Sequence, residues 1–135
     1  MDIIIDKNSD LVVAADIGGS NIRVALVDLS GNILEKEIIR TNPSSGIENA
    51  GYEISKIICS ISKSRSIKGI AYSSAGPINQ ITGQYINPPN LTSWHNKSLI
   101  PILKENLKID SKEFIKVGHD ATLAALAEKK FGKNK

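Results

Sequence analysis

The residues with the clearest potential for chemistry follow an apolar stretch near the start of the chain. Asp16 lies at the end of this stretch, and Gly18, Gly19, Ser20 and Asn21 come soon after it. Glycines let backbone N–H groups approach an anion closely, and successive N–H groups in a turn form a concave anion site. Because a bare carboxylate repels an anion, the pattern favours a hard cation between Asp16 and a phosphate. Mg²⁺ held through water is the usual choice. The alternative is an ordinary glycine turn in which Asp16 is only a turn former.

A second acidic residue, Asp120, follows a short apolar stretch at residues 114–117 and precedes an alanine-rich segment. The segment predicts a helix over residues 120–128, and the partial positive charge at a helix start favours an ionised carboxylate there. Asp120 is therefore a candidate for chemistry, and the alternative is that it only caps the helix.

Two polar segments lie between these carboxylates. One contains Gly76 and Pro77, and the other runs from Asn90 to Trp94. Ligands of open α/β sheets bind beyond the carboxyl ends of the strands, where these loops are expected. Trp94 is interpreted as a core anchor.

The elements that must position these residues follow from the apolar pattern. A β-hairpin and a third strand open the chain, and a helix at residues 47–61 connects them to a further, parallel strand. A second helix is expected after Ser98, with Pro101 in its first turn. The predicted strands cover residues 11–17, 22–29, 33–39, 67–72 and 114–117.

Several of these segments resemble one known family. The stretch DIGGSNIRVAL at residues 16–26 looks like the first phosphate motif of sugar kinases in the actin-like ATPase superfamily, and most closely like that of the ROK family. That family comprises glucokinases, related hexose kinases and repressors. Its Gly-Pro turn is matched at residues 76–77, its Pro-Asn-Leu-x-x-Trp segment at 89–94, and its Asp with an Ala-rich helix at 120–128.

The resemblance implies a fold: an α/β domain of the ribonuclease H-like, actin-like ATPase type. Such a domain has a mixed sheet of about five strands in the order 3-2-1-4-5, with helices on both faces. It also implies a function, the ATP-dependent transfer of a phosphoryl group to a hexose such as glucose.

The residue roles follow from the same resemblance. Asp120 would be the catalytic base, and Asp16 would position hydrated Mg²⁺. Residues 18–21 would hold the phosphates of ATP, while Gly76, Asn90, His119 and Asp120 would bind the sugar. His119 departs from the family, which has Asn at this position. An Asn amide offers two donors and an acceptor, whereas neutral histidine offers one of each, so the sugar specificity is open.

The resemblance covers only the N-terminal half of ROK kinases. The whole chain, residues 1–135, is therefore expected to be a single N-terminal domain without the family's C-terminal domain. In the family, the C-terminal domain carries a second phosphate turn and commonly a zinc motif, so no zinc is expected in this chain. By itself the chain is expected to be inactive, and either a separate C-terminal half or a homo-oligomer would be its partner. The alternative function is a non-catalytic module that binds a sugar or a partner. The repressor branch is disfavoured, because the hairpin begins too early to leave room for an upstream helix-turn-helix.

Composition narrows the function classes further. The chain has 41% hydrophobic and 23% charged residues, which is typical of a globular protein. Its net charge of +3 comes from scattered lysines, so no nucleic-acid partner is expected. With no signal-peptide pattern, no membrane-spanning run and a single cysteine, Cys59, the sequence predicts a cytoplasmic protein without a membrane partner.

Overall fold

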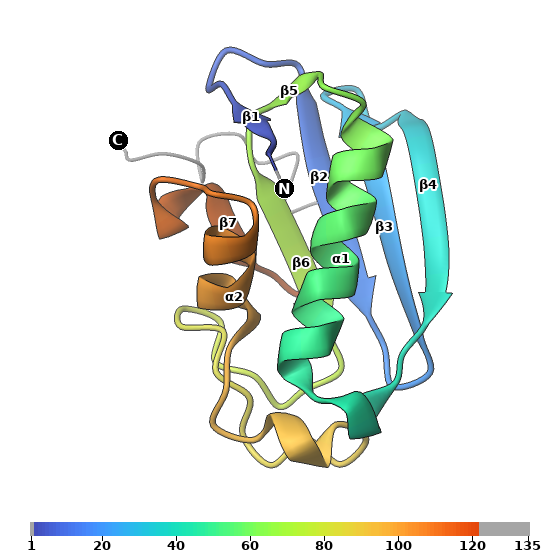
Figure 1. Ribbon diagram of the computed structural model, residues 1–135, viewed down its shortest axis with the longest axis vertical. Coiled ribbons are helices and arrows are strands. Elements are labelled where there is room, and N and C mark those ends of the chain that lie inside the picture. The colour runs from blue at the N-terminus through green and yellow to red at the C-terminus, as the bar shows by residue number, and fades with distance from the viewer. Residues whose placement is uncertain (1, 122–135) are drawn as a thin grey trace.

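A five-stranded mixed sheet forms the centre of the protein, in a computed structural model that describes residues 2–121 (Figure 1). The strand order is β4-β3-β2-β6-β7, which matches the predicted order. The bounds are β2 Leu11–Ile17, β3 Asn21–Asp28, β4 Ile33–Arg40, β6 Ile70–Ser74 and β7 Ile115–Val117. The chain thus begins the sheet at its centre, extends it outward on one side through β3 and β4, and then completes the other side.

Strands β2, β3 and β4 form the expected antiparallel meander. β2 and β3 pair along their full length, from Leu11 opposite Asp28 to Ile17 opposite Ile22. β6 and β7 run parallel to β2, because the helices α1 (Ile47–Ser62) and α2 (Leu99–Asn106) return the chain between them. Consequently the carboxyl ends of β2, β6 and β7 all lie at one edge of the sheet (Figure 1).

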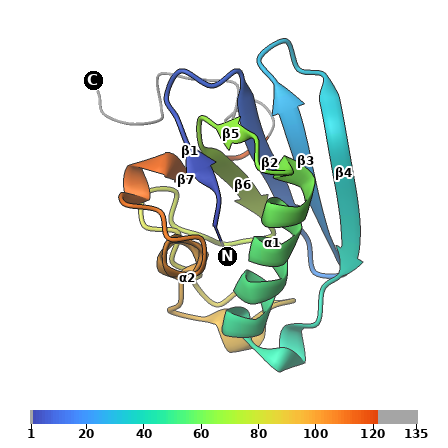
Figure 2. The ribbon, with the colours of Figure 1, turned by 45° about the horizontal axis from the view of Figure 1, so that its top comes forward.

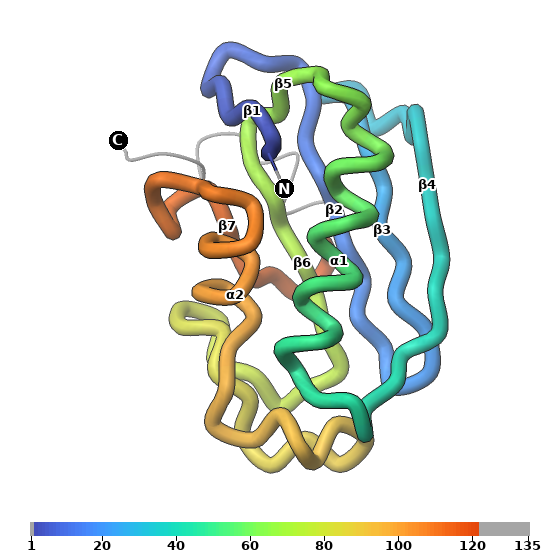
Figure 3. The backbone as a smooth tube through the Cα atoms, viewed as in Figure 1, coloured from blue at the N-terminus to red at the C-terminus, as the bar shows by residue number. Residues whose placement is uncertain are grey.

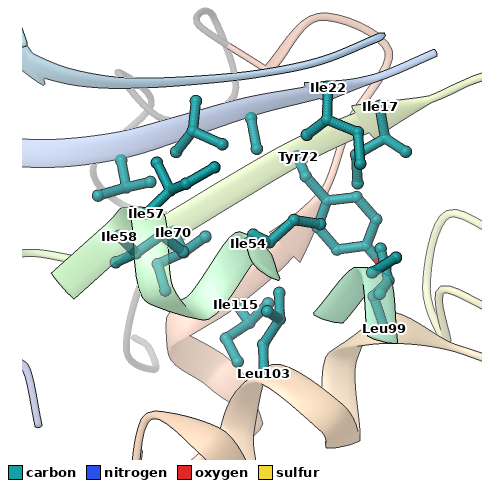
Figure 4. Close-up of a cluster of buried hydrophobic side chains, with 14 of the residues drawn as sticks. Ile17, Ile22, Ile54, Ile57, Ile58, Ile70, Tyr72, Leu99, Leu103 and Ile115 are labelled. Carbon is teal, nitrogen blue, oxygen red and sulfur yellow. The ribbon is translucent and has the colours of Figure 1, made fainter. Parts of the chain in front are cut away.

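Both helices pack on the same face of the sheet and against each other (Figure 2). Apolar residues at helical spacing on α1 meet the odd-numbered residues of β2 and the inward residues of β6. Figure 4 shows this core, with Ile54 and Ile58 of α1 beside Ile70 and Tyr72 of β6. Burial of this apolar face, at ~25 cal/mol per Å², holds the layers together.

The other face of the sheet carries a smaller apolar cluster around Val12, Ala14 and Ala71. Ala121, the last residue described, packs against it. Most of the helix predicted at residues 120–128 lies outside the described residues.

Gly51 lies where α1 meets α2. A Cβ at this position would collide with Cγ2 of Ile102. Glycine costs a helix about 1 kcal/mol relative to alanine. Here the missing side chain lets the two helices approach closely, so the residue that weakens the helix also allows its packing.

The sequence missed the short strand β1 (Ile4–Ile5), which pairs in parallel with β5 (Ser66–Ile67), and the 3₁₀ turns Pro43–Ser45 and Thr92–Trp94. The expected strand at residues 67–72 is therefore divided. Lys68 donates its backbone N–H to Leu11 O and Val13 donates to Gly69 O, and β6 begins only at Ile70. Likewise, Phe114 belongs to the 3₁₀ turn Lys112–Phe114, and β7 begins after it.

Strand β4 is the edge of the sheet, as its charged middle predicts. Glu35 on this strand accepts a hydrogen bond of 2.9 Å from Lys63, just beyond α1, and this bond lowers the pKa of the Glu35 carboxyl. Ile33, Leu34 and Ile38 of β4 are exposed. Within residues 2–121, no helix combines the length and hydropathy that crossing a bilayer requires.

Candidate active site

Asp16 occupies the last exposed position of β2, between two polar residues on neighbouring strands. The register places it opposite Arg23 of β3 and Ser73 of β6. Ser73 Oγ donates to Asp16 Oδ1 at 3.3 Å, and Arg23 Nη1 lies 3.8 Å from Asp16 Oδ2. The carboxylate is therefore held at the carboxyl edge of the sheet while its side chain remains 58% exposed.

The turn that follows Asp16 is tied to the surrounding backbone. Gly18 donates its N–H to Asn21 O at 2.8 Å, which closes the turn. Thr41, just after β4, accounts for two further bonds: its Oγ1 donates to Gly18 O at 2.9 Å, and its N–H donates to Ser20 O at 2.9 Å. These bonds hold the predicted phosphate turn, residues 18–21, in one conformation.

Asn90 lies directly on this turn. A Cβ at Gly19 would come within 2.9 Å of Asn90 Cβ, closer than real Cβ contacts allow. The segment that carries Asn90 crosses the end of the molecule where the hairpin turns (Figure 3). It is tied there by Ser93 Oγ, which donates to Pro43 O at 2.8 Å. The structure thus brings the predicted sugar residue against the predicted phosphate turn.

Trp94 fixes the far end of that segment. Its side chain is fully buried and meets Tyr85 edge to face, with ring centroids 5.3 Å apart. The interpretation of Trp94 as a core anchor is confirmed.

Gly76 lies beside the end of β2. Its neighbour Ala75 donates an N–H to Ile17 O at 2.9 Å, and the Gly76–Pro77 peptide is cis. A Cβ on Gly76 would lie 2.8 Å from Ile78 N, so only glycine fits. Nearby, Tyr85 donates its hydroxyl to Ser74 Oγ at 2.6 Å, and burial raises the pKa of Tyr85 to about 12.

A polar pocket of about 280 Å³ joins the two predicted carboxylates. Asp16, Ser73, His119, Asp120 and Ala121 line it. Gly118 donates its N–H to Tyr72 O at 2.9 Å, which extends the pairing of β6 with β7 and places the following residues beside the end of β6. Asp16 and Asp120, far apart in sequence, therefore face one pocket at the carboxyl edge of the sheet.

Sequence reasoning missed two residues of this site, Arg23 and Ser73. Arg23 could have been found by counting residue pairs back from the hairpin turn. If Ile17 and Ile22 close the hairpin, the next pair is Asp16 with Arg23, and both side chains lie on the same face. Ser73 required the register of β6 against β2, which a single sequence does not contain.

The donor set fits a hydrated divalent cation. Within residues 2–121, no group of three or more His, Cys, Asp or Glu side chains could hold a metal. Mg²⁺ commonly keeps most of its water and is bound through one or two carboxylates plus substrate phosphates. One exposed carboxylate beside a hydroxyl and a backbone turn meets that requirement.

Comparison with known proteins identifies relatives of this chain. The model of the ROK family matches residues 12–135. A glucokinase from Thermotoga maritima is 30% identical over 121 residues, which are 90% of this chain and 37% of that protein. A glucokinase from Halalkalibacterium halodurans is 31% identical over 121 residues, covering 86% of this chain and 35% of that protein.

Solved structures show the same fold. The ROK family glucokinase from Streptomyces griseus, in complex with glucose and AMPPNP, aligns with a TM-score of 0.65 and 25% identity over 93% of this chain and 38% of that one. The ROK hexokinase from Thermus thermophilus aligns with a TM-score of 0.65 and 18% identity, over 79% of this chain and 34% of that one. These likenesses confirm the predicted actin-like ATPase fold. The chain spans about a third of the length of the curated relatives it matches.

Proposed function

Because this chain belongs to the ROK family, we propose that it forms the N-terminal domain of an ATP-dependent hexose kinase of the glucokinase type. Its two curated relatives named above are glucokinases, and the Streptomyces griseus relative was solved with glucose and an ATP analogue. The observation that carries the proposal is the pocket at the carboxyl edge of the sheet. It holds Asp16 and Asp120 together, beside a glycine turn that Asn90 touches.

In this proposal Asp120 is the general base. A carboxylate exposed in a polar pocket can accept the proton of a sugar hydroxyl as that oxygen attacks phosphorus, a contribution of ~10² to 10⁴ in rate. Asn90, Gly76 and His119 orient the sugar from the loops around the same edge. Since phosphoryl transfer depends mainly on positioning and charge neutralisation, fixing these groups on strand ends serves the reaction directly.

The donor side of the site consists of the turn at residues 18–21 and Asp16. Backbone N–H groups of the turn, apart from that of Gly18, which donates to Asn21 O, would hold phosphate oxygens, while Asp16 beside Ser73 would hold a hydrated Mg²⁺. When bound, Mg²⁺ neutralises charge on the phosphates.

The ATP requirement of the proposed reaction and the free thiol of Cys59 are consistent with the cytoplasm, which we propose as the location.

The test is a titration of the ¹⁵N-labelled chain with glucose and other hexoses, followed by NMR. We expect glucose or another hexose to shift the amide signals of Asn90, His119 and Asp120. Asp120→Asn should weaken this binding, because the sugar hydroxyl loses a charged acceptor. Asp10→Asn, a matched exposed carboxylate before the opposite end of β2, should leave it unchanged. If no hexose shifts these signals, the proposed function is wrong.

A coupled assay with MgATP distinguishes a kinase from a sugar-binding module. Shielding the reacting groups from water requires protein on both sides of the cleft, and the described residues form only one side. We therefore expect the 135-residue chain by itself to turn over more slowly than ~1 s⁻¹, the lower end for kinases. Faster turnover that Asp120→Asn abolishes would show that one domain is enough.

A further inference from the structure

The linker between β4 and α1, residues 41–46, is bonded to both halves of the proposed site. It begins at Thr41, which is buried, and continues through the 3₁₀ turn Pro43–Ser45 to the start of α1. One bond joins it to the phosphate turn at residues 18–21, and another joins it to the segment from Asn90 to Trp94, here called the sugar loop. The proposed reaction leaves this linker without a role.

Thr41 sets the direction of the phosphate turn. Its Oγ1 donates to Gly18 O and its N–H donates to Ser20 O, each at 2.9 Å, so two carbonyls of the turn point toward the linker. The peptide unit between Gly18 and Gly19 is trans, and a trans unit directs its N–H opposite to its carbonyl. Thr41 therefore fixes the orientation of the Gly19 N–H, one of the groups that the proposed function assigns to phosphate.

Two residues further along, the same linker holds the sugar loop. Ser93 Oγ donates to Pro43 O at 2.8 Å, and the 3₁₀ turns of the two segments lie against each other (Figure 3). The linker is also tied within itself, because Ser45 donates both its N–H and its Oγ to Asn42 O. A chain of hydrogen bonds thus connects the phosphate turn to the sugar loop by way of Thr41 and Ser93.

The bond made by Ser93 is not needed to keep the sugar loop folded. Leu91 and Trp94, on either side of it, are fully buried and anchor the loop in the core. Ser93 itself is exposed, and the net contribution of one such hydrogen bond to folding is small. Its bond to Pro43 therefore matters less for the stability of the loop than for where the loop lies relative to the turn.

We propose that Thr41 and Ser93 are positioning residues, which hold the phosphate turn and the sugar loop in one arrangement so that a ligand at either site favours binding at the other. This inference rests on the proposed function, since it takes the turn as the phosphate site and the loop as the sugar site. A phosphate that orders the turn also orders the loop through the linker, so the hexose has less motion left to suppress when it binds. By linkage, the hexose strengthens phosphate binding by the same factor.

The coupling is measured as the ratio of two hexose Kd values, without and with saturating Mg²⁺-pyrophosphate. In the wild-type chain this ratio should be about five, the lower end of typical couplings between sites. Thr41→Val is similar in size but lacks the hydroxyl, and it should bring the ratio close to one. Ser93→Ala should do the same. Because both bonds belong to one connection, the double variant should lose no more coupling than either single variant.

The experiment follows the Asn90 amide signal of the ¹⁵N-labelled chain during titration with glucose, or with the hexose of the panel that binds best. Two controls are matched to the variants. Thr41→Ser retains the hydroxyl and should retain the ratio, as should Thr92→Ala, which removes an exposed hydroxyl next to Ser93. The reverse titration, with Mg²⁺-pyrophosphate followed at Gly19, should return the same ratio. Ser93→Ala changes an exposed side chain, so it decides the matter even if Thr41→Val does not fold.

Each outcome is decisive. A ratio of about five in the wild type and both controls, with a ratio near one in Thr41→Val and Ser93→Ala, supports the inference. If the hexose binds and pyrophosphate leaves its Kd unchanged in the wild type, the inference is wrong while the proposed sugar site stands. Weaker binding in the variants with an unchanged ratio also overturns it, as does an equal loss of coupling in Thr92→Ala. If the wild-type chain binds no hexose, the proposed function and the inference fail together.

Discussion

Substituting Gly19 by alanine tests the contact between the phosphate turn and the sugar loop. The new Cβ would lie 2.9 Å from Asn90 Cβ, whereas carbon atoms in contact normally stay ~3.5 to 4.0 Å apart. The turn and the loop must therefore separate by roughly 0.5 to 1 Å. The backbone of Gly19 lies outside the left-handed region, so the strain comes from this contact alone.

We expect two consequences for Gly19→Ala. Overpacking of this kind lowers the free energy of unfolding by about 1 to 3 kcal/mol, which urea denaturation measures. A displacement of about 1 Å at a site can reduce activity about 10²-fold. We therefore expect the hexose affinity in the NMR titration to fall by more than partial unfolding of the variant would account for.

The double variant Gly19→Ala/Asn90→Gly separates the steric effect from the chemical one. Removing the Asn90 Cβ relieves the collision, so the free energy of unfolding should recover relative to Gly19→Ala. Hexose binding should stay weak, because the amide is gone. If Gly19→Ala alone has the same free energy of unfolding and the same hexose affinity as the wild type, the turn and the loop do not touch as described and the reasoning is refuted.

Three further predictions concern the scaffold. Gly51→Ala should destabilise the protein by up to ~2 kcal/mol, because overpacking against Ile102 exceeds the ~1 kcal/mol gain in helix propensity. In a protein that already carries Ile102→Ala, the same substitution should instead stabilise, and a loss of stability in both backgrounds would contradict the contact. Tyr85→Phe should lower the free energy of unfolding by ~1 kcal/mol, since it removes the hydrogen bond to Ser74, and unchanged urea denaturation would show that this bond is inconsequential. Asp28→Asn should destabilise at neutral pH and much less in acid. The backbone N–H of Asn32 donates to the Asp28 carboxyl and holds its pKa low. The stabilisation of the fold by ionised Asp28 is therefore present above the ordinary carboxyl pKa and is lost as the pH falls through the lowered value. A difference in the free energy of unfolding between wild type and variant that does not change with pH would contradict this.

Much of the fold could be predicted from the sequence because its signals are local. Apolar alternation marks β2 and β3, helical spacing marks α1, and the rule that parallel strands need a crossover orders the sheet. The Ser98 cap of α2 was also predictable, and its hydroxyl accepts from Ile100 N at 3.1 Å.

What the sequence missed depends on contacts between distant segments. β1 has only two residues and is a strand because Ser66 and Ile67 lie beside it. The approach of Asn90 to Gly19 and that of Ser73 to Asp16 likewise need the assembled sheet. The sequence could indicate that these residues bear chemistry, but not which atoms they would meet.

The edge strand β4 has a consequence for how copies of this protein behave at high concentration. Two copies could extend the sheet by joining their β4 strands antiparallel about a two-fold axis, in which case one residue must face its own counterpart. If that residue is Glu35, Lys36 or Glu37, a charge faces an identical charge; if it is Ile38, Lys36 faces Arg40. Like charges directly opposite each other destabilise strand pairing. The charges beside the exposed Ile33, Leu34 and Ile38 therefore disfavour these registers of pairing between two β4 edges.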